Sequence, residues 1–125
     1  MSESATDQWL LPILAMIRRL PGNFLGDERV DSLDTFMAGY EQGRMDAGAT
    51  GMTEQDAALL DGFNVWLAKR ANYDLSAGSM RWRLLIKKLD GSERNVHTFF
   101  RLFEEFLAGA GKSLDDPQPW VPSGW

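Results

Sequence analysis

The sequence NVHTFFRLFEEFL, residues 95–107, decides the fold class of this chain. Its apolar residues recur at steps of three and four, the spacing that places side chains on one face of an α-helix. Burial of each phenylalanine is worth about 1.5–3 kcal/mol, so this face needs several other elements to cover it. The stretch predicts a core helix and indicates no chemistry. The residues of its apolar face are Val96, Phe99, Phe100, Phe103, Phe106 and Leu107.

The first helix of the chain is predicted to begin near Trp9 or Leu11, with Pro12 in its first turn, or to begin earlier and kink there. The reason is that proline has no amide hydrogen to donate inside a helix. The Pro21-Gly22 pair is predicted to end this helix, and residues 23–26 are predicted to form a tight loop.

The second helix is predicted to start at an N-cap formed by Asp31 or Ser32, since both residue types accept a hydrogen bond from a first-turn amide. Gly39 and Gly43 lie within it, where each costs up to about 1 kcal/mol relative to alanine. Their spacing of four suggests that another helix packs close to this backbone.

Two more helices precede the phenylalanine helix. The third begins at a capping Thr53 followed by carboxylates, and it ends near Arg70. The fourth covers about residues 79–89, and Ser92 is the expected N-cap of the phenylalanine helix. The predicted inward residues of the fourth helix are Trp82, Leu85, Ile86 and Leu89.

The predicted architecture is therefore all-α, a single compact domain of about five helices over residues 1–111. Residues 112–125 form an extended tail that is rich in proline and tryptophan and cannot be helical. No segment alternates convincingly at a period of two, so no strand is predicted.

The composition is that of an ordinary globular domain. The chain has 125 residues, 44% hydrophobic and 25% charged, enough for one self-sufficient core. The absence of cysteine excludes disulfides, thiolate metal sites and a cysteine nucleophile. The acidic start lacks the basic region of a signal peptide, and no apolar run approaches the roughly 20 residues of a membrane helix. We expect a cytoplasmic protein without a membrane partner.

The net charge of −5 is unevenly distributed. Residues 1–62 carry 11 acidic and 4 basic side chains, whereas residues 63–125 carry 7 acidic and 9 basic ones. Because phosphate contacts need lysine and arginine, nucleic acid is an unfavoured partner for such a chain. The acidic half either attracts a basic surface of a partner protein or serves only to keep the protein soluble.

No motif indicates catalysis. His97 is the only histidine, and on the predicted helix it lies in a row with Arg101 and Glu105, as a surface residue would. One histidine without cysteine speaks against zinc sites of the usual ligand types. Neither Gly-x-Ser-x-Gly nor a phosphate-binding glycine loop is present. We predict no enzyme, no cofactor and no metal site.

The densest acidic cluster consists of Asp27, Glu28, Asp31 and Asp34. These carboxylates either stabilise a helix N-terminus, by a few tenths to about 1 kcal/mol each, or contact a basic partner. A divalent cation is the least favoured alternative, because the spacing lacks the alternating ligands and the terminal glutamate of a calcium loop.

A basic face is predicted on the fourth helix, where Leu84 is expected to lie exposed among four cations. This face is either solvated or touches RNA or an acidic partner. Like charges at Arg83 and Lys87 repel across one helical turn, so an acidic neighbour is expected to balance them. The four cations are Arg81, Arg83, Lys87 and Lys88.

The tail holds Trp120 and Trp125 among Pro117, Pro119 and Pro122. Large exposed aromatic side chains are a liability in water. The two tryptophans therefore either cover the phenylalanine core from outside or anchor a partner protein.

Several stretches together resemble one family of small helical bacterial proteins, some of which are similar to immunity proteins of polymorphic toxin systems. IRRLPGNFLG at residues 17–26 is similar to an I-x-x-R-P-x-x-Y/F-L-G motif, although Leu20 interrupts the Arg-Pro pair. LDTFMAGY at residues 33–40 resembles an L-x-x-F-x-x-G-Y helix. The remaining matching stretches are residues 63–67, 82–86 and 99–106.

The resemblance implies a non-enzymatic protein that neutralises a cognate toxin by covering its active surface. The acidic cluster would then meet a basic toxin surface, with Trp120 and Trp125 as further partner contacts. The alternative is a structural or regulatory interaction protein, for example a homodimer that buries the two tryptophans.

Overall fold

Helix α6 (Val96–Gly109) is the helix predicted from the phenylalanine pattern. In this computed structural model, which describes residues 8–115, the side chains of Phe99, Phe103 and Leu107 are fully buried. The ring of Phe63, from α4 (Glu54–Arg70), meets the rings of Phe99 and Phe103 edge-on, with centroids 5.6 and 4.9 Å apart. The phenylalanine face is thus a core surface, as predicted.

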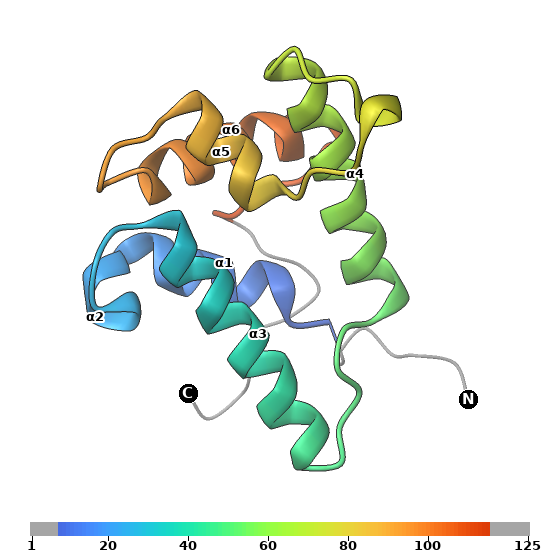
Figure 1. Ribbon diagram of the computed structural model, residues 1–125. Coiled ribbons are helices and arrows are strands. Elements are labelled where there is room, and N and C mark those ends of the chain that lie inside the picture. Colours follow the sequence, from blue (N-terminus) through green and yellow to red (C-terminus); the bar gives the residue numbers. More distant parts are fainter. Residues whose placement is uncertain (1–7, 116–125) are drawn as a thin grey trace.

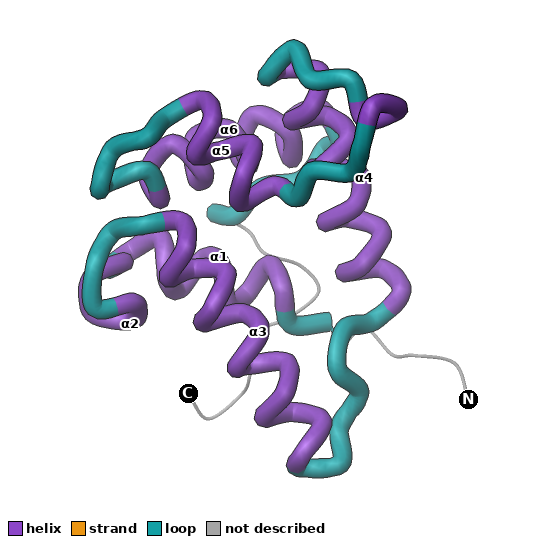
Figure 2. Tube along the Cα trace, viewed as in Figure 1, coloured by secondary structure: helices purple, strands orange, loops and turns teal. Residues whose placement is uncertain are grey.

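The described part of the chain is all-helical and forms one compact domain, which confirms the predicted fold class (Figures 1 and 2). Besides the predicted helices it contains one short helix, α2, and a single 3₁₀ turn, η2. The elements are α1 (Leu10–Arg19), α2 (Pro21–Leu25), α3 (Val30–Asp46), α4, η2 (Leu75–Ala77), α5 (Trp82–Leu89) and α6. Within residues 8–115, no helix is both long enough and apolar enough to cross a membrane.

The helices lie on two levels in Figure 1. α5 and α6 lie above α1 and α3 in this view, and α4 runs along one side. α3 and α4 each contact both α5 and α6, so these two long helices join the levels. At the edge away from α4, the turn after α2 lies beside the turn before α6 (Figure 1). There the amide of Val96 donates a hydrogen bond of 3.0 Å to the carbonyl of Glu28.

The start of α1 agrees with the prediction, because Pro12 lies in its first turn. The loop predicted at residues 23–26 is wrong, since most of it belongs to α2. Pro21 occupies the first position of α2, where its missing amide hydrogen costs nothing and its fixed φ suits a helix. Gly26 ends α2 with a φ of 80°. Pro21 therefore begins α2 as well as following the end of α1.

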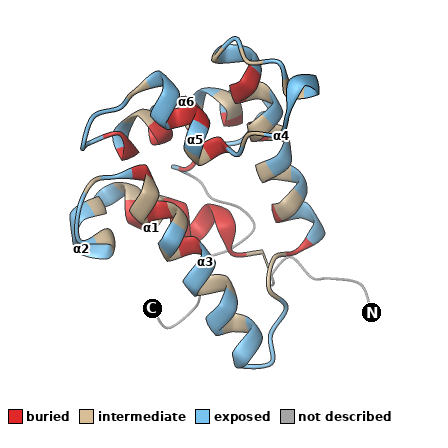
Figure 3. Ribbon diagram, in the orientation of Figure 1, coloured by how far each residue is buried: buried red, intermediate tan, exposed pale blue. Residues whose placement is uncertain are grey.

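The predicted close packing at Gly39 and Gly43 is wrong. Both glycines lie in the C-terminal half of α3, and no neighbouring atom would come within 4 Å of an added Cβ atom. The buried residues of α3 are Val30, Leu33 and Met37, all in its first half. Figure 3 shows the far half of α3 extending away from the other helices with mostly exposed and partly buried residues.

Helix α5 is shorter than predicted and begins at Trp82. Trp82, Leu85 and Ile86 are buried as expected, but Leu89 is 42% exposed because it is the last residue of the helix. Leu84 is exposed, as predicted.

Helix α6 ends in a Schellman motif, in which the amide of Lys112 donates to the carbonyl of Leu107 and that of Gly111 to Ala108. Gly111 has the φ of 72° that this motif needs. Beyond it, Leu114 is buried in the core, 1% exposed. Trp120 and Trp125 lie outside the described residues.

Candidate protein-interaction face

The acidic cluster lies at the turn between α2 and α3 and on the first half of α3, opposite α5. Asp31 Oδ1 accepts a hydrogen bond of 2.7 Å from Arg83, and its Oδ2 accepts one of 3.0 Å from Lys87. The hydrogen bond from Arg83 and then that from Lys87 lower the pKa of Asp31. Asp31 is therefore the acidic neighbour that the repulsion between positions 83 and 87 predicted.

Asp34, one turn further along α3, faces the N-terminus of α5. Its two oxygens lie 2.9 and 3.1 Å from the two terminal nitrogens of Arg81, a bidentate pair. Arg83 Nε lies 3.3 Å from Asp34 Oδ2. Two members of the acidic cluster thus meet most of the basic face in one network of ion pairs between α3 and α5, although the sequence suggested two separate surfaces. The network consists of Asp31 and Asp34 with Arg81, Arg83 and Lys87.

Glu28 joins the same turn to the start of α6. His97 Nε2 lies 2.7 Å from Glu28 Oε1, and Arg94 Nε donates to Oε2 at 3.1 Å. These hydrogen bonds, from His97 first and Arg94 second, lower the pKa of Glu28. His97 is half-exposed, as expected of a surface histidine.

Asp27 differs from the other three carboxylates because its hydrogen bonds go to its own turn. Its Oδ1 accepts from the amide of Arg29 at 3.0 Å, and its Oδ2 accepts from the hydroxyl of Ser32 at 2.9 Å. Both bonds, the backbone one first, lower the pKa of Asp27. Among residues 8–115 it has no ion-pair partner, so Asp27 retains the least compensated negative charge of the cluster.

The predicted N-cap at Asp31 or Ser32 is wrong. The residue before α3 is Arg29, which makes no capping bond of its own. The amide of Val30 donates instead to the side chain of Asn95, at 2.8 Å. Asn95 is buried, 4% exposed, and its amide group also donates to the carbonyl of Asp90 at 3.1 Å. It, rather than Ser92, is the residue preceding α6.

A second cap of this kind is formed by Asp56, in the first turn of α4. Thr53 caps α4 as predicted, accepting from the amide of Asp56 at 3.1 Å. The Asp56 carboxylate turns to the start of α1, where its Oδ2 accepts from the amides of Trp9 and Leu10 at 2.9 and 3.2 Å. Burial raises the pKa of Asp56, although these two amide bonds act in the opposite direction.

Sequence reasoning missed both caps because each joins residues far apart in the chain. The sequence does carry a weak signal, a short polar side chain placed directly beside an apolar helical face. Such a residue is buried only with hydrogen-bond partners. The partner itself is not visible in the sequence.

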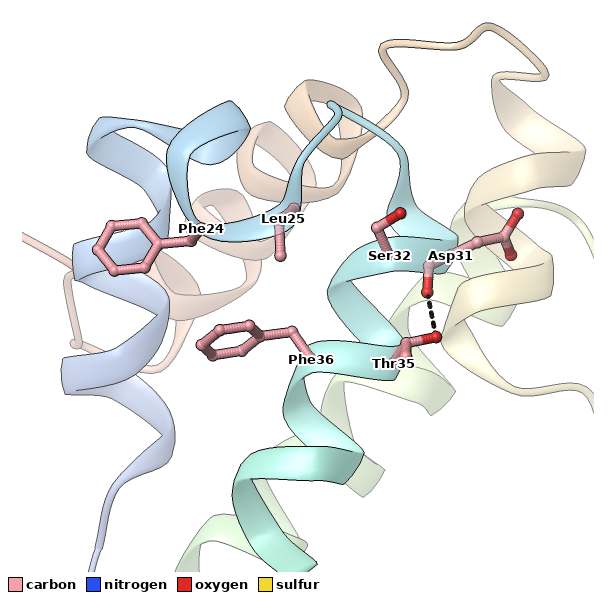
Figure 4. A pocket seen from close by; sticks show the side chains of 6 residues that line it. All are labelled: Phe24, Leu25, Asp31, Ser32, Thr35 and Phe36. Atoms are coloured by element: carbon pink, nitrogen blue, oxygen red, sulfur yellow. Dashed lines mark hydrogen bonds between the residues drawn. The ribbon is translucent and has the colours of Figure 1, made fainter. Parts of the chain in front are cut away.

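A groove of about 330 Å³ lies next to the acidic cluster, between α2 and α3. Phe24, Leu25 and Phe36 line its apolar part, and Figure 4 shows the rings of Phe24 and Phe36 on the same side of the groove. Ser32 and Thr35 line the other part, while the carboxylate of Asp31 points away toward α5 (Figure 4). Phe24 is 38% exposed, so the groove opens onto an apolar patch.

A polar crevice of about 650 Å³ lies on the other side of the cluster, between the turn after α2 and the turn before α6. Asp27, Glu28 and Arg29 line one wall, and Glu93 and Arg94 line the other. Arg29 and Glu93 form an ion pair of 2.8 Å across it. Ser32 of the groove wall is bonded to Asp27 of the crevice wall, so groove and crevice adjoin at this turn, and we call this surface the α2–α3 face.

Within residues 8–115, no three histidine, aspartate or glutamate side chains gather in an arrangement that would hold a metal ion. Comparison with protein-family models, with curated proteins and with solved structures finds no match to this chain.

Proposed function

We propose that this chain is a cytoplasmic binding protein that neutralises a cognate toxin by covering its active surface. The observation that supports it best is the composition of the α2–α3 face, where the half-exposed Phe24 lines an apolar groove next to the acidic cluster. A hydrophobic anchor site with a charged rim is the usual anatomy of a protein–protein contact. The choice of a toxin as the partner rests on the family resemblance.

The ion pairs change the expected role of the four carboxylates. Asp31 and Asp34 are held by α5, so their charge is largely compensated before a partner arrives. Asp27 and the turn around it are the part of the cluster that a basic toxin surface would meet first. Exposed pairs such as that of Glu28 with Arg94 contribute little stability, because solvent screens them, and they can exchange partners at an interface.

The proposal is tested by co-expressing this chain with the protein encoded by the gene next to its own, measuring growth and then complex formation with the purified proteins. We expect protection and a stable complex. The double variant Asp27→Lys/Glu28→Lys is expected to slow association about tenfold or more at low salt, since rim charges act mainly on the association rate.

The matched control is Asp46→Lys/Asp61→Lys, which changes the net charge equally at exposed sites outside the α2–α3 face. It is expected to slow association much less. Equal association rates for the two double variants would remove the acidic cluster from the contact. A toxin that neither binds nor is neutralised would overturn the proposed function.

A further inference from the structure

We propose that the C-terminal tail of this chain docks on its own domain, with the indole ring of Trp120 in the groove between α2 and α3. The inference concerns the protein without a partner and does not depend on the toxin-binding role.

The first argument is where the described chain ends. Leu114 is buried in the core, and Asp115 Oδ1 lies 2.6 Å from Arg18 Nη2. Arg18 is in the last turn of α1, directly before α2. Asp115 therefore lies at the corner between α1 and α2. Trp120 follows five residues later, a reach of up to about 18 Å, so the groove beside α2 is accessible to it.

The second argument is that this corner lacks a cover within residues 8–115. Leu20 is 56% exposed and Phe24 is 38% exposed, and both follow Arg18 by six residues or fewer. Arg19 is also exposed and has no ion-pair partner among the described residues. Along the domain, the cation Arg19 comes first and the exposed apolar residue Phe24 follows. Along the tail, the carboxylate of Asp116 comes first and the aromatic ring of Trp120 follows, so the two segments are complementary in the same order.

The third argument is the hydrogen-bonding chemistry of the groove. The hydroxyl of Ser32 donates to Asp27 Oδ2, and that of Thr35 donates to the carbonyl of Asp31 at 3.1 Å (Figure 4). Both hydroxyl protons are thus engaged, and each oxygen keeps a lone pair to accept another bond. A fitting occupant is apolar and carries a donor without an acceptor. The indole of Trp120 has this combination, because its N–H is a donor only.

A tethered segment also has an advantage over a second copy of the chain. Short flexible tethers give effective concentrations in the millimolar range, well above usual protein concentrations. Docking removes a large exposed aromatic side chain from water and covers the apolar patch at the same time.

The test uses the absence of cysteine from the chain, so that two introduced cysteines are the sole thiols. The variant Thr35→Cys/Val121→Cys places one thiol on the groove wall and the other beside Trp120, and it leaves the Ser32 hydroxyl in the groove as the acceptor for the indole. Under mild oxidation we expect an intrachain disulfide. The rate of its formation is measured by non-reducing electrophoresis at several protein concentrations, and the native helix content is checked by circular dichroism.

The matched control is Ala108→Cys/Val121→Cys. Ala108 is exposed in the last turn of α6 and is closer to the tail along the chain, so an undocked tail would reach it at least as easily. We expect the groove pair to close about tenfold faster than the control pair. Adding Phe24→Ala or Trp120→Ala to the groove pair is expected to remove this difference.

Equal rates for the two pairs, or a rate unaffected by Phe24→Ala and Trp120→Ala, would overturn the proposal. Disulfide-linked dimers that grow with protein concentration would also overturn it, because the occupant would then be a second copy.

Discussion

Asp56 lies where the N-termini of α1 and α4 meet, and its raised pKa predicts how the stability of the protein depends on pH. Because the folded-state pKa is raised above the ordinary value of 3.8, its contribution to stability is present below that pH and is lost as the pH rises through the folded-state pKa. Asp31 has the opposite sign. Its pKa is lowered, so its contribution is present above pH 3.8 and is lost as the pH falls through the folded-state value.

We therefore expect the variants Asp56→Asn and Asp31→Asn to show opposite pH slopes. The stability of the natural protein relative to Asp56→Asn should fall as the pH rises above 3.8, while its stability relative to Asp31→Asn should rise toward a plateau. Urea denaturation across this pH range measures both differences. Parallel curves for the two variants would contradict the assigned shifts.

Phe63 is the residue whose loss should cost the core most. Its ring contacts those of Phe99, Phe103 and Phe106, with centroids 4.9 to 5.6 Å apart, and the side chain is fully buried. We expect Phe63→Ala to lower the free energy of unfolding by about 3–5 kcal/mol in urea titrations. Val65→Ala is the control, since Val65 is 49% exposed on the same helix and should change stability by about 0.5 kcal/mol or less. Similar losses at both positions would contradict this packing.

At the scale of elements, α3 and α6 are joined through their N-termini. Asn95 accepts from the first amide of α3, and the first amide of α6 donates to the carbonyl of Glu28. The first amide groups of a helix have no acceptor within that helix. Here the residue before α6 supplies an acceptor for α3, and the turn before α3 supplies one for α6. This exchange holds the turn after α2, and with it the α2–α3 face, against the start of α6.

We expect Asn95→Ala to lower the free energy of unfolding by about 1–3 kcal/mol, because it leaves the buried amide of Val30 without an acceptor. Asn23→Ala, at an exposed position, is the control in the same thermal and urea measurements. An effect of Asn95→Ala no larger than that of Asn23→Ala would show that the cap contributes nothing.

At the scale of the whole molecule, part of the uneven charge along the chain is compensated by ion pairs between its two halves. Asp31 and Asp34 of α3 pair with cations of α5, and Glu28 pairs with Arg94, so three of the four carboxylates of the acidic cluster are compensated within the molecule. Recognition by that face then depends on Asp27 and on the apolar groove beside it. This is why the proposed charge reversal targets the turn and leaves the α3–α5 pairs in place.

The fold class and most helix positions could be predicted from the sequence, since helical periodicity and caps such as Thr53 are local. The candidate site was predicted only in part. The carboxylates were recognised, but the groove was not, because it depends on residues 23–26 being helical rather than a loop.

The sequence by itself therefore determined a helical domain around the apolar face of residues 96–107, because spacing of three and four makes that face whatever the rest of the chain does. Only the tertiary structure decided which polar groups meet. Asp56 and Leu10 lie 46 residues apart, Asp31 and Arg83 lie 52 apart, and Asn95 and Val30 lie 65 apart. Such pairs follow from how the helices pack, and packing places a buried amide or a carboxylate opposite its partner without leaving a local pattern in the sequence.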